Sequence, residues 1–270
     1  MPKPLTALSH AQVKEIKWLL TDVDDTLTWE GQLPPETLEA LGKLKDAGIC
    51  VVAVTGACAG WCDQIAKMWP VHGVIGENGA FWMQKNEAGF HTHSLIPMDK
   101  MRSQQQALIE LLEQVLERYP DIEFANDQGF RYCDVAINLG QDREQVDTEI
   151  ATRLLNDILQ LSLDEQPLKA TQSSIHINVW VGEHSKRYTS EKYLKHNADF
   201  VDLRLENIGY IGDSLNDESM FEWLPTTFGV SNIHSILQKL STQPAFITKS
   251  PGGYGFAELA NIISAEMRKN

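Results

Sequence analysis

The sequence predicts an α/β fold, a doubly wound parallel sheet with an α+β layer inserted into it. Apolar runs alternate with amphipathic helical segments before residue 84 and again after residue 181, as in parallel strands covered by helices on both faces. Between these parts, long helical segments alternate with pairs of strand-like runs. We therefore expect a catalytic core from residues 1–84 and 181–270 and a cap from residues 85–180.

The first core segment repeats a unit of strand and helix. Ile16 to Leu20 is an apolar run leading into acids, which suits a buried strand. A helix is predicted over Glu36 to Ala47, because leucines recur on one face and Gly48 follows at the C-cap position. The next strand, helix and strand are predicted over 49–54, 60–68 and 73–75.

The inserted segment has a different order of predicted helices and strands. Helices are predicted over 99–119 and 143–161, and strands over 89–95, 121–124, 130–138, 168–170 and 174–181. Long helices that alternate with strand pairs are typical of a small α+β module. The alternation of single strands and helices then resumes, with a helix predicted over 190–196 and a strand over 207–211.

Composition narrows the function classes. The chain has 270 residues, and 37 acids against 23 Lys and Arg give a formal charge of -14, which argues against nucleic-acid and membrane partners. The four cysteines lack a paired metal-binding spacing, so we expect free thiols. An apolar leader and a membrane-length apolar run are not found. We predict a cytoplasmic protein, monomeric or a small homo-oligomer, that acts on a small molecule.

Polar clusters follow three predicted strands: Asp22-Val23-Asp24-Asp25-Thr26, Thr55-Gly56 and Gly212-Asp213-Ser214-Leu215-Asn216-Asp217. Because the carboxyl ends of parallel strands lie at one edge of a sheet, these clusters should share a crevice. Carboxylates crowded there repel one another, and a divalent cation with oxygen ligands relieves that repulsion. The sequence thus predicts a Mg²⁺ site. An EF-hand loop is excluded, because Leu27 stands where such a loop requires glycine.

These clusters, together with a lysine before the last of them, resemble the four motifs of the haloacid dehalogenase superfamily. The large insert resembles the cap of its Cof-type, phosphomannomutase-like and sugar-phosphate phosphatase branch. Gly76-Glu77-Asn78-Gly79-Ala80 and Pro251-Gly252-Gly253-Tyr254-Gly255 resemble two further loops of that branch. The resemblance covers both core segments and implies a Rossmann-like core.

The resemblance also implies roles for the motif residues. Asp22 would attack phosphorus to form an aspartyl phosphate, and Asp24 would protonate the leaving oxygen and then activate water. Asp22, the Asp24 backbone carbonyl and Asp213 would hold Mg²⁺, with Asp217 supporting or replacing a ligand. The expected substrate-binding residues are Thr55, Gly56, Asn78, Lys186 and Asn216.

The lysine has three candidates, Lys186, Lys192 and Lys195. We favour Lys186, because Lys186-Arg187-Tyr188 resembles a run at this point in phosphomannomutase-like members and stands at the start of a predicted helix. The other two fall within that helix. A lysine there would offset the charge that builds up in phosphoryl transfer.

One rival function uses another nucleophile. Gly212-Asp213-Ser214-Leu215 matches a Gly-Asp-Ser-Leu esterase motif with Ser214 as nucleophile. That family carries the motif near its N-terminus and an Asp-x-x-His near its C-terminus, and no histidine here follows an aspartate at that spacing. The rival also leaves the first cluster unexplained.

Several other residues are weaker candidates. His91 and His93 share one strand face, a spacing used by zinc sites, but no third ligand is evident. We expect at least two of Trp29, Trp61 and Trp82 to pack in the core. Ala57 replaces the arginine that many Cof-type members carry after Thr-Gly, which puts one phosphate contact in doubt. Cap or hinge residues that could face a substrate are Arg131, Asp134, Asn178 and Glu183.

The leading hypothesis is a Mg²⁺-dependent phosphatase that hydrolyses a small phosphate monoester. A sugar phosphate or a phosphorylated glycoside such as mannosyl-3-phosphoglycerate is the expected substrate. A phosphomutase of the phosphomannomutase type is the closest alternative, because the same four motifs serve it. A catalytically idle phosphosugar sensor is disfavoured by the intact Asp22 and Asp24.

Overall fold

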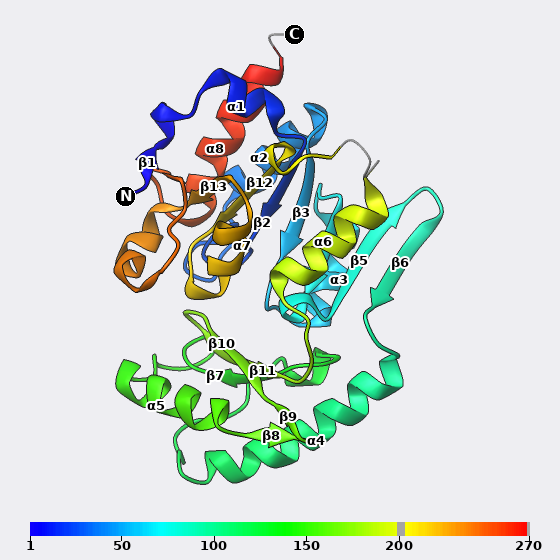
Figure 1. Cartoon of the computed structure of the whole chain (residues 1–270), viewed down its shortest axis with the longest axis vertical. Helices are drawn as coiled ribbons and strands as arrows, with labels where there is room; N and C mark the ends of the chain where they lie inside the picture. The colour runs from blue at the N-terminus through cyan, green and yellow to red at the C-terminus, as the bar shows by residue number, and fades with distance from the viewer. Residues whose placement is uncertain (199–202, 269–270) are drawn as a thin grey trace.

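The protein consists of a larger α/β body stacked on a smaller α+β body. The computed structural model describes residues 1–198 and 203–268. Figure 1 shows the two bodies one above the other, joined by two segments that run between them. Residues 199–202 and 269–270 of the predicted core fall outside the described part.

The larger body is built on one nine-stranded sheet within the described residues. Its strand order is β1-β14-β13-β12-β2-β3-β4-β5-β6, parallel throughout except for the last two pairings, β4 with β5 and β5 with β6. In that order the strands are Lys3–Pro4, Phe246–Ile247, Thr226–Gly229, Ile208–Gly212, Trp18–Thr21, Cys50–Val54, Gly73–Gly76, Phe81–Asn86 and Gly89–Ser94. The prediction of a parallel α/β sheet is confirmed.

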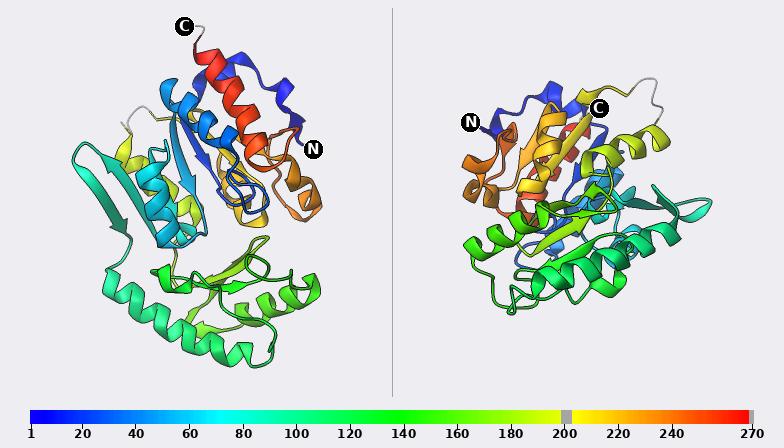
Figure 2. Two further views of the ribbon diagram at one scale, coloured as in Figure 1. Left: turned by 180° about the vertical axis from the view of Figure 1, so that it is seen from behind. Right: turned by 60° about the horizontal axis from the view of Figure 1, so that its bottom comes forward.

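Helices cover both faces of this sheet. One face carries α1 (His10–Glu15), α2 (Pro35–Asp46), α3 (Ala59–Met68) and α8 (Gly252–Met267), and the other carries α6 (Lys186–Asn197) and α7 (Glu218–Trp223). Successive strand residues point to opposite faces, so Leu19 packs in the first layer and Leu20 in the second. Figure 2 shows the first layer from behind. Continuous apolar strands are therefore explained by two-sided burial.

The smaller body has its own core. An antiparallel sheet of β10 (Lys169–Gln172), β11 (His176–Trp180) and β7 (Val135–Asn138) is backed by α4 (Met98–Leu116) and α5 (Thr148–Leu159). A two-strand hairpin of β8 (Ser162–Leu163) and β9 (Gln166–Pro167) follows α5. Ile177 and Val179 of β11 pack on the helices. Because strand side chains alternate, His176 and Asn178 face the larger body.

Three features differ from the sequence predictions. β6 falls in the range predicted for the cap, yet it pairs with β5 in the large sheet, which moves the proposed boundary from residue 85 to the link between β6 and α4. The predicted strand over 121–124 is reduced to one bridge, between Phe124 and Ile137. The strand predicted over 130–138 is shortened, because a 3₁₀ turn occupies Gln128–Phe130.

Candidate active site

Asp22 and Asp24 follow β2 at the edge of the sheet that faces the smaller body. The Asp22 backbone N–H donates to Ile211 of β12 at 2.9 Å, which continues the sheet pairing to the start of the loop. Burial, Asp217 and Asp24 raise the pKa of Asp22 to about 8, against the opposing effect of Lys186. Burial and Asp25 raise the pKa of Asp24 to about 6. Both carboxyls line a small cavity of about 20 Å³.

Lys186 occupies the centre of the site. It is the first residue of α6, after Ser185, whose side chain caps the helix. Its Nζ lies 2.7 Å from Asp22 Oδ1, 2.7 Å from Asp217 Oδ1 and 3.1 Å from Asn216 Oδ1. Burial alone would lower the pKa of this ammonium, but Asp217 and Asp22 outweigh burial and raise it. Of the three candidate lysines, Lys186 is therefore the one that reaches Asp22 in the structure.

The acids around Lys186 form a candidate metal centre. Carboxylate oxygens of Asp22, Asp213 and Asp217 lie within 4.8 Å of one another, the single such group among the described residues. Burial, Asp22 and Asp217 raise the pKa of Asp213 well above its ordinary value. Asp213 is held by hydrogen bonds from Thr26 Oγ1 at 3.0 Å and Asn232 Nδ2 at 2.9 Å. A hard divalent cation fits this oxygen-rich, crowded set.

Asp217 has a different environment from the other two acids. Its Oδ2 accepts the backbone N–H groups of Asp213 and Ser214, at 2.9 and 3.1 Å, and its Oδ1 accepts Lys186 and the Tyr210 hydroxyl. Both oxygens are thus engaged within the protein. Asp217 was expected either to support a metal ligand or to replace one. This arrangement favours the supporting role, in which Asp217 positions Lys186 and the metal-binding loop.

The expected phosphate-binding residues follow β3 and β12. Thr55 is fully buried, and its Oγ1 accepts the Ala57 N–H at 2.9 Å, which leaves its O–H free to donate. Asn216 Oδ1 accepts Lys186 and Ser214 Oγ, so its amide N–H₂ is its remaining donor toward the cavity. Gly56 lines the cavity, where a β-carbon would approach Asn78 Nδ2 at 3.1 Å.

Asn78 is the expected binding residue that the structure sets apart. Its side chain is 2% exposed, packs behind Gly56, and has no hydrogen-bond partner at either amide atom. It adopts a left-handed backbone conformation, with φ of 54°. Of the expected substrate-binding residues, Gly56 and Asn216 line the small cavity, whereas Asn78, Thr55 and Lys186 lie behind its lining.

The smaller body closes over the small cavity. Ser173, Ser174, His176 and Asn178, from β11 and the turn before it, form the opposite wall. Ser174 Oγ donates to Asp25 Oδ2 at 2.8 Å. Asp25, which had no expected role, therefore tethers the tip of the β10–β11 hairpin to the catalytic loop.

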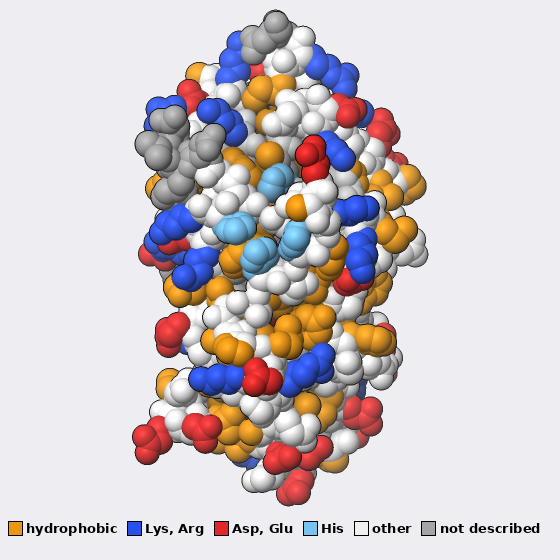
Figure 3. Space-filling view, turned by 90° about the vertical axis from the view of Figure 1, so that its right-hand side faces the viewer, with side chains coloured by type: hydrophobic (Ala, Val, Ile, Leu, Met, Phe, Trp, Pro, Cys, Tyr) orange, Lys and Arg blue, Asp and Glu red, His pale blue; other side chains and the backbone are white. Residues whose placement is uncertain are grey.

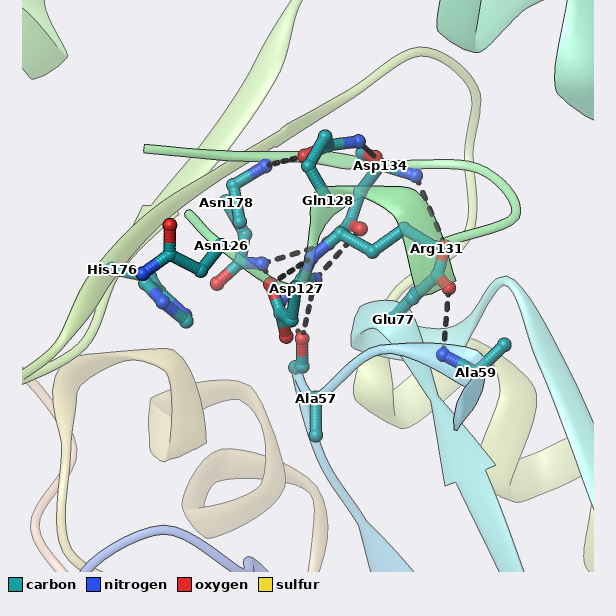
Figure 4. A network of polar contacts seen from close by, with 12 residues as sticks. Ala57, Ala59, Glu77, Asn126, Asp127, Gln128, Arg131, Asp134, His176 and Asn178 are labelled. Atoms are coloured by element: carbon teal, nitrogen blue, oxygen red, sulfur yellow. Dashed lines mark hydrogen bonds and ion pairs between the residues drawn. The ribbon is translucent and has the colours of Figure 1, made fainter. Parts of the chain in front are cut away.

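Glu77 joins the two bodies, a role that its sequence did not suggest. Its two carboxylate oxygens accept four backbone N–H groups, from Ala59 of the core and from Tyr132, Cys133 and Asp134 of the smaller body, at 2.7 to 3.1 Å. Figure 4 shows Glu77 between these two segments. Burial and Asp134 raise the pKa of Glu77 to about 8.

Three of the four weaker cap candidates belong to the same network. Arg131 Nη1 donates to the Gly56 carbonyl at 3.0 Å and to Asp134 Oδ1 at 2.9 Å, and Asn178 Nδ2 donates to Asp134 Oδ2 at 2.8 Å. A cap guanidinium thus contacts the Thr55-Gly56 motif. Glu183 instead pairs with Lys169 at the surface.

A second, larger cavity of about 600 Å³ opens on the other side of Asp24. Trp29 and Trp61 line it. Trp61 is 52% exposed, and only Trp82 of the three tryptophans is buried. The expectation that at least two of them pack in the core is wrong. Trp29 lies in the loop after β2, and Trp61 lies near the start of α3 at the edge of the face that Ala59, Cys62, Ile65 and Ala66 bury.

The histidine pair on β6 has an aromatic environment. His93 stacks on Trp82 with ring centroids 4.9 Å apart, and it lies 4.9 Å from His196 of α6 and 6.4 Å from His91. Figure 3 shows histidines gathered on this face. Their nitrogens are not among the metal-binding groups found in the described residues.

Ser214 is not arranged as an esterase nucleophile. Its Oγ donates to Asn216 Oδ1 at 2.7 Å and lies 3.5 Å from Asp217 Oδ2. The recorded partners are therefore an amide and the carboxylate that holds Lys186, rather than a histidine base. The four cysteines are free, as predicted. None of the described helices meets the length and hydropathy that a membrane span requires.

Comparison with known proteins gives concordant matches. Residues 19–130 match the family described as haloacid dehalogenase-like hydrolase. A phosphoglycolate phosphatase of Methanobrevibacter smithii is 22% identical over 242 residues, 89% of this chain and 95% of its own. A second one, of Methanoculleus marisnigri, is 26% identical over 245 residues, 90% of this chain and 94% of its own.

Solved structures share the fold. The C-terminal domain of a C. albicans trehalose-6-phosphate phosphatase superposes with a TM-score of 0.72 at 15% identity, covering 98% of both chains. A haloacid dehalogenase-like hydrolase of Bacteroides thetaiotaomicron superposes with a TM-score of 0.64 at 14% identity, covering 92% of this chain and 99% of its own. The family match and the motifs that follow β2, β3 and β12 make the chain similar to haloacid dehalogenase-like hydrolases, and the solved structures show that it shares their fold.

Proposed function

We propose that this hydrolase is a phosphatase that cleaves a small phosphate monoester, with a sugar phosphate as the leading substrate class. The observation that carries the proposal is the contact of Lys186 with Asp22 at 2.7 Å, beside Asp213 and Asp217. A carboxylate held against an ammonium in a crowded acidic site is suited to attack a phosphoryl group whose charge the same ammonium offsets. The phosphatases among the similar proteins support this reaction class.

Each residue has a proposed task. Asp22 attacks phosphorus and forms an aspartyl phosphate, while Asp24 gives a proton to the leaving oxygen and later takes one from the attacking water. A raised pKa suits Asp24 to carry that proton. The Thr55 hydroxyl, the Lys186 ammonium and the Asn216 amide bind phosphoryl oxygens.

A metal completes the proposed site. Asp22, the Asp24 carbonyl and Asp213 would hold Mg²⁺, and Asp217 would fix Lys186 beside it. When bound, Mg²⁺ supplies positive charge that screens the Asp22 carboxylate from the phosphate it attacks. The phosphomutase alternative differs in its product, because a mutase returns the phosphoryl group to the sugar and releases no inorganic phosphate.

The test is release of inorganic phosphate from a panel of phosphorylated metabolites, with Mg²⁺ and with excess chelator. We expect release that requires Mg²⁺ and that Asp22→Asn lowers by about 10⁴-fold or more, as loss of a nucleophile does. Asp63→Asn, which alters an exposed ion pair on α3, is the matched control. Undiminished turnover by Asp22→Asn, at unchanged folding, would refute the mechanism. Sugar isomerisation without phosphate release would favour the mutase.

A further inference from the structure

The larger cavity lies where the leaving group of the proposed reaction must go. It shares Asp24, Ser174 and His176 with the small cavity that contains Asp22. A phosphoryl group in the small cavity therefore directs its ester oxygen past Asp24 and the rest of the substrate into the large one. This inference rests on the proposed phosphatase function.

The electrostatic character of the large cavity is acidic. Asp24, Asp25, Glu30 and Asp127 line it. Arg131 is the one permanently cationic residue among its described lining, and this guanidinium already pairs with Asp127 at 3.0 Å and with Asp134 at 2.9 Å. A carboxylate placed here would meet like charge and lose its hydration without a free cationic partner.

His176 adds a polar group without adding charge. Burial lowers the pKa of this histidine to about 4, so its ring is neutral near pH 7. The side chain is 4% exposed, and its Nε2 is buried without a hydrogen-bond partner in the protein. The His176 side chain lines both cavities and so brings a neutral, polar ring beside the path of the scissile oxygen.

The remaining walls suit a ring that carries hydroxyls. Trp29, Trp61 and Trp69 present aromatic surface, and Gln64, Gln141 and Gln145 present amide groups. Tryptophan packs against the apolar face of a pyranose, while amides and carboxylates accept its hydroxyl protons. A volume of about 600 Å³ is within the range of small-molecule sites. A two-carbon acid such as glycolate would leave most of it unfilled.

We propose that the large cavity binds an uncharged sugar ring as the leaving group and selects against esters whose leaving group carries a carboxylate. Selection against carboxylates acts through repulsion. The acidic lining weakens the binding of a carboxylate-bearing leaving group more than it strengthens the binding of an uncharged sugar. Phosphoglycolate and phosphoglycerate-containing esters fall in the rejected class.

The test compares matched phosphate esters with the full-length enzyme and Mg²⁺. Glucose 1-phosphate is paired with glucuronic acid 1-phosphate, which has the same ring with a carboxylate at one carbon. Galactose 1-phosphate is paired in the same way with galacturonic acid 1-phosphate. We expect kcat/KM for the neutral member of a cleaved pair to exceed that for the acidic member by about tenfold or more, as for a contact with one like charge. Glycerol 3-phosphate is the neutral ester without a ring.

Two variants distinguish the contribution of the aromatic lining from that of the acidic charge. Trp61→Ala should lower the ratio of kcat/KM for the hexose ester over glycerol 3-phosphate by about tenfold, through KM, as loss of an aromatic contact does. Met68→Ala, at the exposed end of the same helix, is its control. Glu30→Gln should narrow the gap between neutral and acidic esters about threefold, because it removes one like charge.

The outcomes separate the inference from the function on which it rests. Equal or better turnover of the acidic members, or an unchanged ratio in Trp61→Ala, would overturn the inference. Cleavage of p-nitrophenyl phosphate without cleavage of any hexose ester would overturn the inference alone. No phosphate release from any ester, the nitrophenyl ester included, would overturn the proposed phosphatase function and the inference with it.

Discussion

The two sides of Asp24 are constructed differently. On the core side, a cavity of about 20 Å³ is lined by Asp22, which is paired with Lys186, and by loops that continue directly from buried strands. On the other side, a cavity of about 600 Å³ is lined by half-exposed tryptophans, a core loop and cap turns. The small cavity has room for a few atoms held in fixed positions, whereas the large cavity can surround a group of variable size. Under the proposed function, this difference corresponds to chemistry on the core side and recognition on the cap side.

The largest effect expected after that of Asp22→Asn is also on the core side. Lys186→Met removes the ammonium that lies between Asp22 and Asp217. We expect kcat to fall by about 10³-fold with a smaller change in KM, because the lost charge acts mainly on the transition state. Steady-state phosphate release measures both constants. Lys192→Met, farther along the same helix, is the control, and an equal loss in that variant would remove the distinction between the two lysines.

Loss of the Glu77 hydrogen bonds between the two bodies is expected to lower the stability of the protein substantially. Glu77→Gln replaces a carboxylate oxygen by an N–H₂ group that faces backbone donors. We expect the free energy of unfolding to fall by about 2–4 kcal/mol, since buried donors lose their acceptor. Urea denaturation measures this change, with Glu87→Gln in the exposed β5–β6 turn as control. A change below about 0.5 kcal/mol, the scale of surface substitutions, would remove Glu77 from its linking role.

Acid should weaken the folded protein through a buried histidine, His184, which lies between β11 and α6. Burial, with Lys169 next in effect, lowers the pKa of His184 to about 4 from 6.5. Below about pH 6.5 the unfolded state binds a proton that the folded state refuses, so stability present at pH 7 is lost as the pH falls toward 4. His184→Gln should therefore lose less stability between pH 7 and 5 than the parent, by on the order of 1–2 kcal/mol. Identical pH profiles in urea denaturation would contradict this.

The smallest expected effect concerns the tether between Asp25 and Ser174. Ser174→Ala removes one partly exposed hydrogen bond of 2.8 Å at the hairpin tip. We expect KM to rise about two- to fivefold with kcat nearly unchanged, because an exposed hydrogen bond contributes only at the low end of the range for a single bond. Ser103→Ala on the exposed side of α4 should leave KM unchanged. A larger effect on kcat than on KM would place Ser174 on the chemical side instead.

The core side was largely predictable from sequence, because its residues directly follow apolar strands. Asp22, Thr55 and Asp213 each stand one residue past a strand end, and the parallel topology brings them together. Lys186 was found from a resemblance and from its place at a helix start. Its contact with Asp22 spans 164 residues of sequence, so spacing alone could not supply it.

The cap side was less predictable for physical reasons. Glu77 binds backbone amides more than 50 residues away, and such contacts leave no pattern in side-chain spacing. β6 was assigned to the cap although Glu87-Ala88-Gly89, with Gly89 at a φ of 125°, carries a hairpin signal. Trp61 precedes the buried Ile65 by one helical turn, so the helical period alone did not place its side chain outward. Glu77 and Trp61 required the structure, and β6 required closer use of local geometry.

Glu77 also has a consequence for how this enzyme can diversify. The carboxylate binds the smaller body through the main-chain N–H groups of Tyr132, Cys133 and Asp134, so this anchor does not depend on which side chains those residues carry. Every residue except proline offers the same N–H. Substitutions around the large cavity can therefore accumulate while the smaller body stays bound to the larger one. The set of substrates can then change without a change in the contacts that join the two bodies.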